Sequence, residues 1–286
     1  MKVSISKRNG KAALKGNWGL SIGTMVLYTI LVSGVILFIT PLFSDTMERL
    51  DLVWAVLFTP VMSAGVRWLH LGLIDGEKLS ISHIFDGFKF YGQLVFMNFL
   101  KGIIAILWAV IPTLFGAIIF VSLLENAASL GGAMMAITLY IAIPTVVVII
   151  VLLKYAQAVY LFKNNAYLGV REALKESKEL MKGSKMDYAL LNLGYALWYL
   201  PAVMLLYAAW YQSVLALIPP ALDGNPAATQ IAANMSTLAI VYGAAISFYI
   251  VPQWNAAMAA FHRLLVPLES EENHKPAFVD EGSWLG

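Results

Sequence analysis

Long stretches without a charged side chain constrain this chain more than any other feature. They include residues 17–44, 102–124, 126–153 and 188–222. A helix needs about 20 predominantly apolar residues to cross the roughly 30 Å hydrocarbon core of a bilayer. Each stretch is long enough, and only 13% of all residues are charged, whereas a soluble domain usually carries roughly 25%. The sequence therefore predicts an all-α membrane protein.

About six transmembrane helices are expected within residues 18–265. They are predicted near residues 18–39, 52–73, 102–124, 132–153, 188–211 and 235–261. Residues 1–17 form a basic N-terminal segment, and residues 266–286 form a polar tail that is expected to be disordered. The first uncharged stretch exceeds the roughly 7–15 residues of a signal-peptide core, so we expect that helix to be retained.

The Lys and Arg residues predict an orientation. All 19 of them except Arg49 fall on one side of an alternating six-helix arrangement. The positive-inside rule places that side in the cytoplasm. We therefore expect a multi-pass protein with both termini in the cytoplasm.

Two segments between the predicted spans have the pattern of amphipathic helices. In residues 166–182 the apolar face carries Val170, Leu174 and Met181. In residues 81–91 it carries Ile81, Ile84, Phe85 and Phe88. Such helices either lie in the headgroup layer with the apolar face toward the lipid or pack against the helix bundle, and both alternatives stay open.

Basic residues in and beside the longer segment are candidate contacts for anionic lipids or for a membrane protein partner. They are Arg171, Lys175, Lys178, Lys182 and Lys185. The alternative is a solvated helix in which acidic neighbours pair with these cations. Nucleic acid is not an expected partner, because the basic residues are spread over separate short segments.

A weak internal repeat predicts three helical hairpins. Leu-Lys-Gly at 14–16 precedes the first predicted span, and Met-Lys-Gly at 181–183 precedes the fifth. Pro60, Pro144 and Pro252 lie in the second, fourth and sixth. Internal repeats are common in transporters, and chance similarity between apolar segments is the alternative.

Several motifs together resemble the DUF975 family of bacterial integral membrane proteins. The most specific is Ser177-Lys178-x-x-Met181-Lys182-Gly183, in which Gly183 is expected to end the preceding helix in a left-handed conformation. The others are Leu14-Lys15-Gly16-Asn17-Trp18, Pro60-x3-Ala64-Gly65, Ile84-Phe85-x-Gly87-Phe88 and Pro252-x7-Ala260-Phe261-His262-Arg263-Leu264. The candidate structural residues drawn from these motifs are Gly16, Asn17, Trp18, Pro60, Gly65, Gly183 and Pro252.

The resemblance implies a location in the bacterial cytoplasmic membrane. The chain departs from the family pattern at Lys163-Asn164-Asn165, where Asp-Asn-Pro is expected, and at Pro144-Thr145, where Pro-Gly is expected. It is also distantly similar to the membrane domains that accompany glycerophosphodiester phosphodiesterases.

No catalytic or metal-binding signature stands out. The chain has no cysteine, and its four histidines are not spaced as metal ligands. Basic residues in the predicted spans lie near cytoplasmic helix ends, where snorkelling to water explains them: Arg67, Lys101, Lys154 and Arg263. Interhelical hydrogen bonding is the ordinary role of the remaining amide side chains, namely Asn98, Gln157, Asn192, Gln212, Gln253 and Asn255. We expect no metal, no cofactor and no enzymatic activity.

Two functions fit these observations. The first is a non-enzymatic accessory or scaffold factor in a lipid, envelope or export process. The alternative is a small transporter or permease for an amphipathic substrate, which the repeat and the helix prolines favour.

Overall fold

The structure is a computed structural model. It describes residues 1–34, 50–125, 130–165, 168–215 and 226–267. Within these ranges the chain is helical and contains no strand, which confirms the all-α class. Helices long and apolar enough to cross a membrane cover Val53–Ile74, Ile81–Glu125, Gly132–Lys163, Lys185–Ser213 and Thr229–Leu265. A shorter apolar helix covers Trp18–Gly34. Residues 35–39 of the first predicted span and most of the predicted tail lie outside the described residues.

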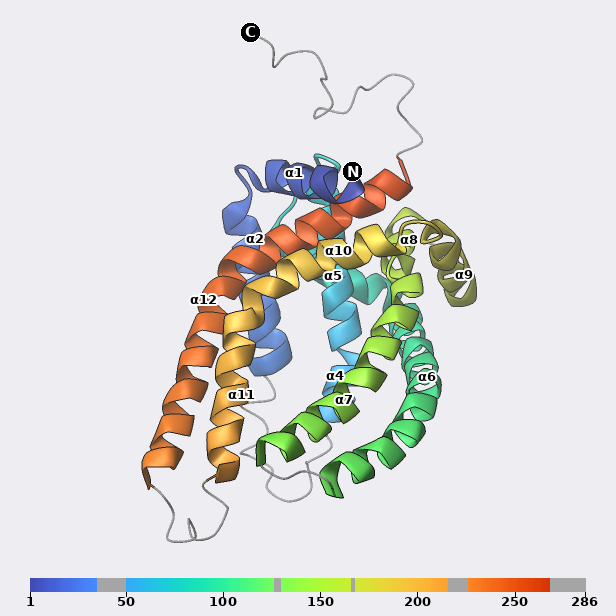
Figure 1. Cartoon of the computed structure of the whole chain (residues 1–286). Helices are drawn as coiled ribbons and strands as arrows, with labels where there is room; N and C mark the ends of the chain where they lie inside the picture. Colours follow the sequence, from blue (N-terminus) through green and yellow to red (C-terminus); the bar gives the residue numbers. More distant parts are fainter. Residues whose placement is uncertain (35–49, 126–129, 166–167, 216–225, 268–286) are drawn as a thin grey trace.

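The helices of residues 2–74 include one that crosses an end of the bundle and others that run along it (Figure 1). They are α1 (Lys2–Leu14), α2 (Trp18–Thr29) with its π-helical continuation η1 (Ile30–Gly34), α4 (Leu50–Leu57) and α5 (Thr59–Ile74). Helix α1 lies across one end of the bundle against α12 (Pro226–Leu265). At Gly10 an added methyl group would overlap the backbone of Ala256 and Ala257, so the two helices touch backbone to backbone. We call this end of the bundle the α1 end.

Two long hairpins follow. In the first, the 3-10 helix η3 (Ile81–Phe90) runs directly into α6 (Tyr91–Glu125), which packs against α7 (Leu130–Leu152). The chain returns to the α1 end through η4 (Leu153–Tyr155), α8 (Ala158–Asn164) and α9 (Val170–Leu180). In the second, α10 (Lys185–Ala196), η5 (Leu197–Tyr199) and α11 (Leu200–Leu215) lead to α12, which packs along α11.

The core lies toward the α1 end. One cluster of buried residues joins α5, α6, α8, α9 and α12 and includes Trp68, Leu94, Phe162 and Ala259. The Trp68 indole N–H donates to the Val159 carbonyl oxygen at 2.7 Å. Away from this end, α6, α7 and α11 present mostly exposed aliphatic and aromatic side chains. That pattern is typical of helices whose solvent is lipid.

Two helix boundaries differ from the sequence prediction. Helix α6 begins at Tyr91 rather than near residue 102, because η3 continues into it without a loop. With 35 residues it is about 52 Å long at 1.5 Å per residue, too long to lie wholly within the hydrocarbon core. Pro60 lies inside the second predicted span, but that span is divided at Phe58, so the proline falls in the first turn of α5. A first-turn proline fits because the missing N–H would have no helical partner there.

The prediction that four apolar residues of the segment 81–91 share one face is wrong. Ile84 is fully buried, whereas Ile81, Phe85 and Phe88 are 41%, 44% and 39% exposed. The segment is a 3-10 helix with three residues per turn, so Ile81, Ile84 and Gly87 share one face, and Phe85 and Phe88 share another.

Candidate functional site

Reciprocal glycines join α5 to η3. A methyl group on Gly65 would overlap the Ile84 carbonyl oxygen, and one on Gly87 would overlap the Val61 carbonyl oxygen. Each glycine therefore lets the backbone of the other element come into contact. This geometry gives two of the family-like motifs, Ala64-Gly65 and Gly87-Phe88, a shared structural role.

A buried ion pair joins the end of α5 to the last turns of α12. Arg263 Nε and Nη2 donate to Asp75 Oδ1 and Oδ2, both at 2.7 Å. The arginine and aspartate side chains are only 13% and 8% exposed. The prediction that Arg263 snorkels to water is therefore wrong, because a carboxylate on a neighbouring helix neutralises it.

Ser177, from the most specific motif, lies at the centre of a second buried network. Its hydroxyl donates to the Lys154 carbonyl oxygen at 3.0 Å and accepts the Gln157 N–H at 3.1 Å. The Gln157 amide oxygen lies 3.1 Å from His262 Nδ1, and the Tyr160 ring stacks on the His262 ring. The network ties α9 and α8 to α12.

The other amide side chains follow the interhelical prediction only in part. Asn192 of α10 accepts the Trp254 indole N–H of α12 at 3.1 Å, which is an interhelical bond. Asn255 donates both to the Val251 carbonyl oxygen of its own helix and to Met25 Sδ of α2 at 3.9 Å, which is also interhelical. Gln253 donates to the Tyr249 carbonyl oxygen of its own helix.

The five basic candidate residues do not form one continuous patch on α9. Arg171, Lys175 and Lys178 are exposed and share a stripe, since i, i+4 and i+7 positions lie within about 60° of each other on a helix. Lys182 follows α9 and pairs with Glu179, and this hydrogen bond lowers the pKa of the Glu179 carboxyl. Lys185 begins α10. The buried face of α9, with Ala173, Leu174 and Ser177, packs against the bundle.

The candidate turn residues mark two similar entries into the bundle. Gly16 before α2 and Gly183 before α10 have φ of +86° and +74°, the left-handed region that glycine adopts without strain. Asn17 precedes α2, where its side chain donates to the Ala13 carbonyl oxygen, and Trp18 is the first residue of α2. Gly87, which precedes the third predicted span, has no positive φ. Pro252 lies inside α12.

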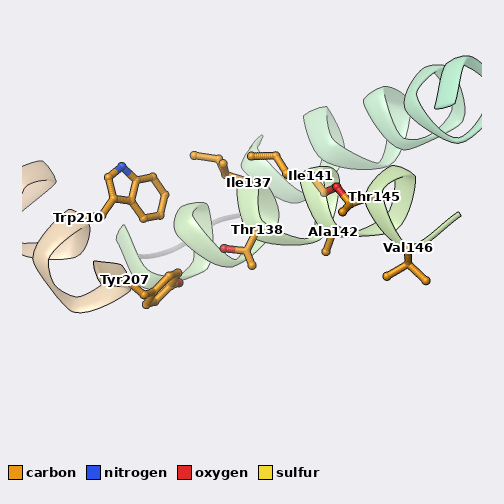
Figure 2. Close-up of a pocket in the computed structure, with 8 residues that line it drawn as sticks. All are labelled: Ile137, Thr138, Ile141, Ala142, Thr145, Val146, Tyr207 and Trp210. Carbon is orange, nitrogen blue, oxygen red and sulfur yellow. The ribbon is translucent and has the colours of Figure 1, made fainter. Parts of the chain in front are cut away.

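A lateral groove lies between the two hairpins (Figure 2). Helix α7 contributes aliphatic and threonine side chains, and α11 contributes Tyr207 and Trp210, whose ring centroids are 5.8 Å apart. The groove is open and holds about 480 Å³. Its α7 residues are Ile137, Thr138, Ile141, Ala142, Thr145 and Val146.

The groove lining suits hydrocarbon. Thr138 and Thr145 donate their hydroxyl hydrogens to the Met134 and Ile141 carbonyl oxygens of their own helix, each at 2.8 Å. The outward surface of α7 is therefore carbon-rich, and the two aromatic rings form the opposite wall. Among the residues that the structure describes, no group of three or more potential metal ligands comes together.

Apolar helices of membrane-spanning length, held together at one end by a polar and aromatic core, define this chain as a helical integral membrane protein. A family model described as "Protein of unknown function (DUF975)" matches residues 1–267, and the chain belongs to that family. No curated protein and no solved structure matches the chain. The distant similarity to phosphodiesterase membrane domains stays a prediction.

The sequence did not predict the pairs of residues that are far apart along the chain but in contact in the structure. Asp75 and Arg263 are 188 residues apart, and Gln157 and His262 are 105 apart. One signal was present, because His262-Arg263 lies in a motif that resembles the family pattern. The sequence offers no comparable signal for Tyr207 or Trp210 as groove residues.

Proposed function

We propose that this protein is a non-enzymatic accessory factor of the bacterial cytoplasmic membrane that serves a lipid, envelope or export process. Its intramembrane contact site is the groove between α7 and α11, and the occupant is the acyl chain of a membrane lipid. Both termini and the α1 end face the cytoplasm.

The composition and position of the groove carry this proposal. It opens sideways between two membrane-length hairpins, and its lining offers aliphatic carbon and aromatic faces. Acyl chains fill such surfaces by dispersion contacts and need no hydrogen-bond partner. None of the eight lining side chains is charged, so a charged substrate would find no counter-charge there.

The distribution of basic residues supports the orientation. Helices α1, α8 and α9 and the last turns of α12 lie at the α1 end and carry most of the Lys and Arg residues that the structure describes. The ends of α6 and α11 and the starts of α7 and α12 lie at the opposite end. A cytoplasmic α1 end therefore satisfies the positive-inside rule.

Lipid retention tests the groove. Ala142 is an exposed groove residue, so Ala142→Trp should fill the space, and an exposed alanine of α12 outside the groove provides the matched control, Ala245→Trp. In native mass spectrometry of protein from mild detergent, Ala142→Trp should retain at most half as much lipid as the parent, while Ala245→Trp retains the parental amount. Equal retention by all three would contradict the proposal.

The transporter alternative predicts a different result. Vesicles reconstituted with the parent would show protein-dependent flux of an amphipathic substrate, and Ala142→Trp would abolish it. Such flux would contradict the accessory role and identify the protein as a transporter. Its absence across a panel of lipids and amphipathic peptides would support the accessory role.

A further inference from the structure

A recess at the α1 end has a chemistry unlike that of the groove. It holds about 310 Å³ and is lined by residues of the α1–α2 junction and of α12. The lining residues are Lys11, Lys15, Gly16, Trp18, Tyr249 and Gln253. Three of them come from the Leu14-Lys15-Gly16-Asn17-Trp18 motif, which contributes no residue to the groove between α7 and α11.

Two pairs of lysines, three of them in α1 and one directly after it, have different surroundings. Lys2 donates to Ser184 Oγ at 2.7 Å, and Lys7 lies over the Tyr195 ring, so both bind α10. Lys11 and Lys15 are exposed, one helical turn further along, and neither forms an ion pair with any residue that the structure describes. The recess therefore has two cations without a protein counter-charge.

The start of α2 adds a second attraction for an anion. Asn17 is the N-cap residue, but its side chain turns back to the Ala13 carbonyl oxygen and does not cap the helix. The first-turn N–H groups of a helix have no intrahelical acceptor, and they carry the positive end of the helix dipole. Because Gly16 and Trp18 flank this helix start and line the recess, an anion bound there would lie near the positive end of α2.

The remaining wall indicates a membrane interface. The Trp18 and Tyr249 rings stack with centroids 5.8 Å apart and nearly parallel planes. Trp and Tyr are enriched where a membrane-spanning helix meets the headgroup layer, and Trp18 opens the first apolar helix. Gln253 is the least exposed lining residue, and its amide nitrogen donates to the Tyr249 carbonyl oxygen.

We propose that this recess binds the phosphate of an anionic phospholipid headgroup, with Lys11, Lys15 and the first turn of α2 around the phosphate and the Trp18–Tyr249 pair beside the glycerol region. Open space at Gly16, where an added methyl group would meet no atom within 4 Å, leaves room for the headgroup. Headgroup binding here goes beyond the proposed function and does not depend on what occupies the groove between α7 and α11.

Lipid titration of the full chain tests this site. Phosphatidylglycerol added to the detergent-solubilised parent should raise its melting temperature, and phosphatidylcholine should do so much less. Each basic residue near an anionic surface strengthens binding about fivefold. Lys11→Gln with Lys15→Gln should therefore raise the half-saturating phosphatidylglycerol concentration about tenfold or more, and each single variant about fivefold. Lys11→Arg with Lys15→Arg should keep the parental value.

A matched control removes the same charge elsewhere. Arg8→Gln with Lys78→Gln takes two exposed cations from outside the recess and should change the half-saturating concentration less than twofold. An equal loss in this control, or no loss in the recess variants, would overturn the proposal. Stabilisation by inorganic phosphate or glycerol phosphate alone, at the level given by the lipid, would also overturn it, because the ligand would then be a free phosphate.

Discussion

Two kinds of glycine shape this fold at the scale of single residues. Gly65 and Gly87 are needed because another backbone occupies the place of their side chains. Gly16 and Gly183 have open space around them and are needed for their positive φ. An added side chain should therefore act through overlap at the first pair and through backbone strain at the second.

Gly65→Ala should destabilise the protein by about 1–3 kcal/mol, the usual cost of forcing extra volume into a packed contact. The added methyl group has to displace the Ile84 carbonyl group, and with it η3. Gly102→Ala in α6 is the matched control, because no atom lies within 4 Å of the new methyl position. Thermal unfolding in detergent should show a lower melting temperature for Gly65→Ala alone, and an equal loss in both variants would rule out the contact.

Gly183→Val should cost about 1 kcal/mol or more, because a β-branched residue is strained at a φ of +74°. Gly183→Asn should cost less, since asparagine tolerates the left-handed region. Melting temperatures measured side by side should rank the parent first, then Asn, then Val. If Asn and Val gave the same loss, the conformation of Gly183 would not be the cause.

At the scale of elements, the α1 end is held by contacts between helices that are distant in sequence. The Asp75–Arg263 pair fixes α12 to α5, and the Ser177 network fixes α9 to α8 and η4. Both are nearly inaccessible to solvent. Breaking one partner of such a contact leaves an unsatisfied buried group, which costs more than the contact itself contributes.

The Asp75–Arg263 pair should therefore respond asymmetrically. Asp75→Leu leaves the Arg263 guanidinium buried without its carboxylate and should cost about 3 kcal/mol or more. Asp75→Leu combined with Arg263→Met removes both charges and should recover much of that loss. A double-mutant cycle on melting temperature in detergent measures the coupling. Simple additivity of the two single effects would show that the pair does not act as a unit.

The basic stripe of α9 gives a prediction that separates lipid contact from a solvated helix. Arg171, Lys175 and Lys178 share one exposed stripe, whereas Lys182 is engaged by Glu179. If the stripe contacts anionic lipid, Lys175→Gln with Lys178→Gln should lower the amount of phosphatidylglycerol or cardiolipin that co-purifies. Lys182→Gln should change it little. An unchanged lipid content in the double variant would leave α9 as a solvated or partner-binding helix.

The elements were predictable to the extent that they follow from apolar length. Uncharged runs indicated α6, α7, α11 and α12, because a membrane-spanning helix must satisfy its backbone within itself and leaves a local signal. The face of η3 was not predictable in this way, because it depends on the contact of Ile84 and Gly87 with α5. The start of α6 was missed because η3 continues into it without a loop, and the break at Phe58 because apolar length alone does not mark the start of α5 near Pro60. The groove and the Asp75–Arg263 pair join segments far apart in sequence, and no local pattern specifies such partners.

At the scale of the whole molecule, the basic side chains and the buried core lie at the α1 end, and exposed apolar surface dominates elsewhere. Two hairpins project from that shared core, in which α6 packs against α7 and α11 against α12, and α12 also packs extensively against α1 and α5. The internal repeat is partly reflected in this arrangement. Gly16 and Gly183 adopt the same conformation before α2 and α10, while η3 enters α6 without such a turn.

This asymmetry leads to a topology prediction that cysteine labelling can test, since the chain has no cysteine of its own. A labelled cysteine has to be accessible, and the Ser177 side chain is fully buried. The neighbouring Lys178 is exposed and lies in the same segment, which is expected inside the cell, so Lys178→Cys is the suitable probe. Lys178→Cys should react with a membrane-impermeant maleimide only after the cells are permeabilised. Ser44→Cys and Asn225→Cys, at positions outside the described residues, should react in intact cells, because the six-helix arrangement places them opposite the basic segments. Labelling of Lys178→Cys in intact cells would place the α1 end outside the cell. The proposed orientation would then be wrong, and the lysines of the α1 end could not contact the anionic cytoplasmic leaflet.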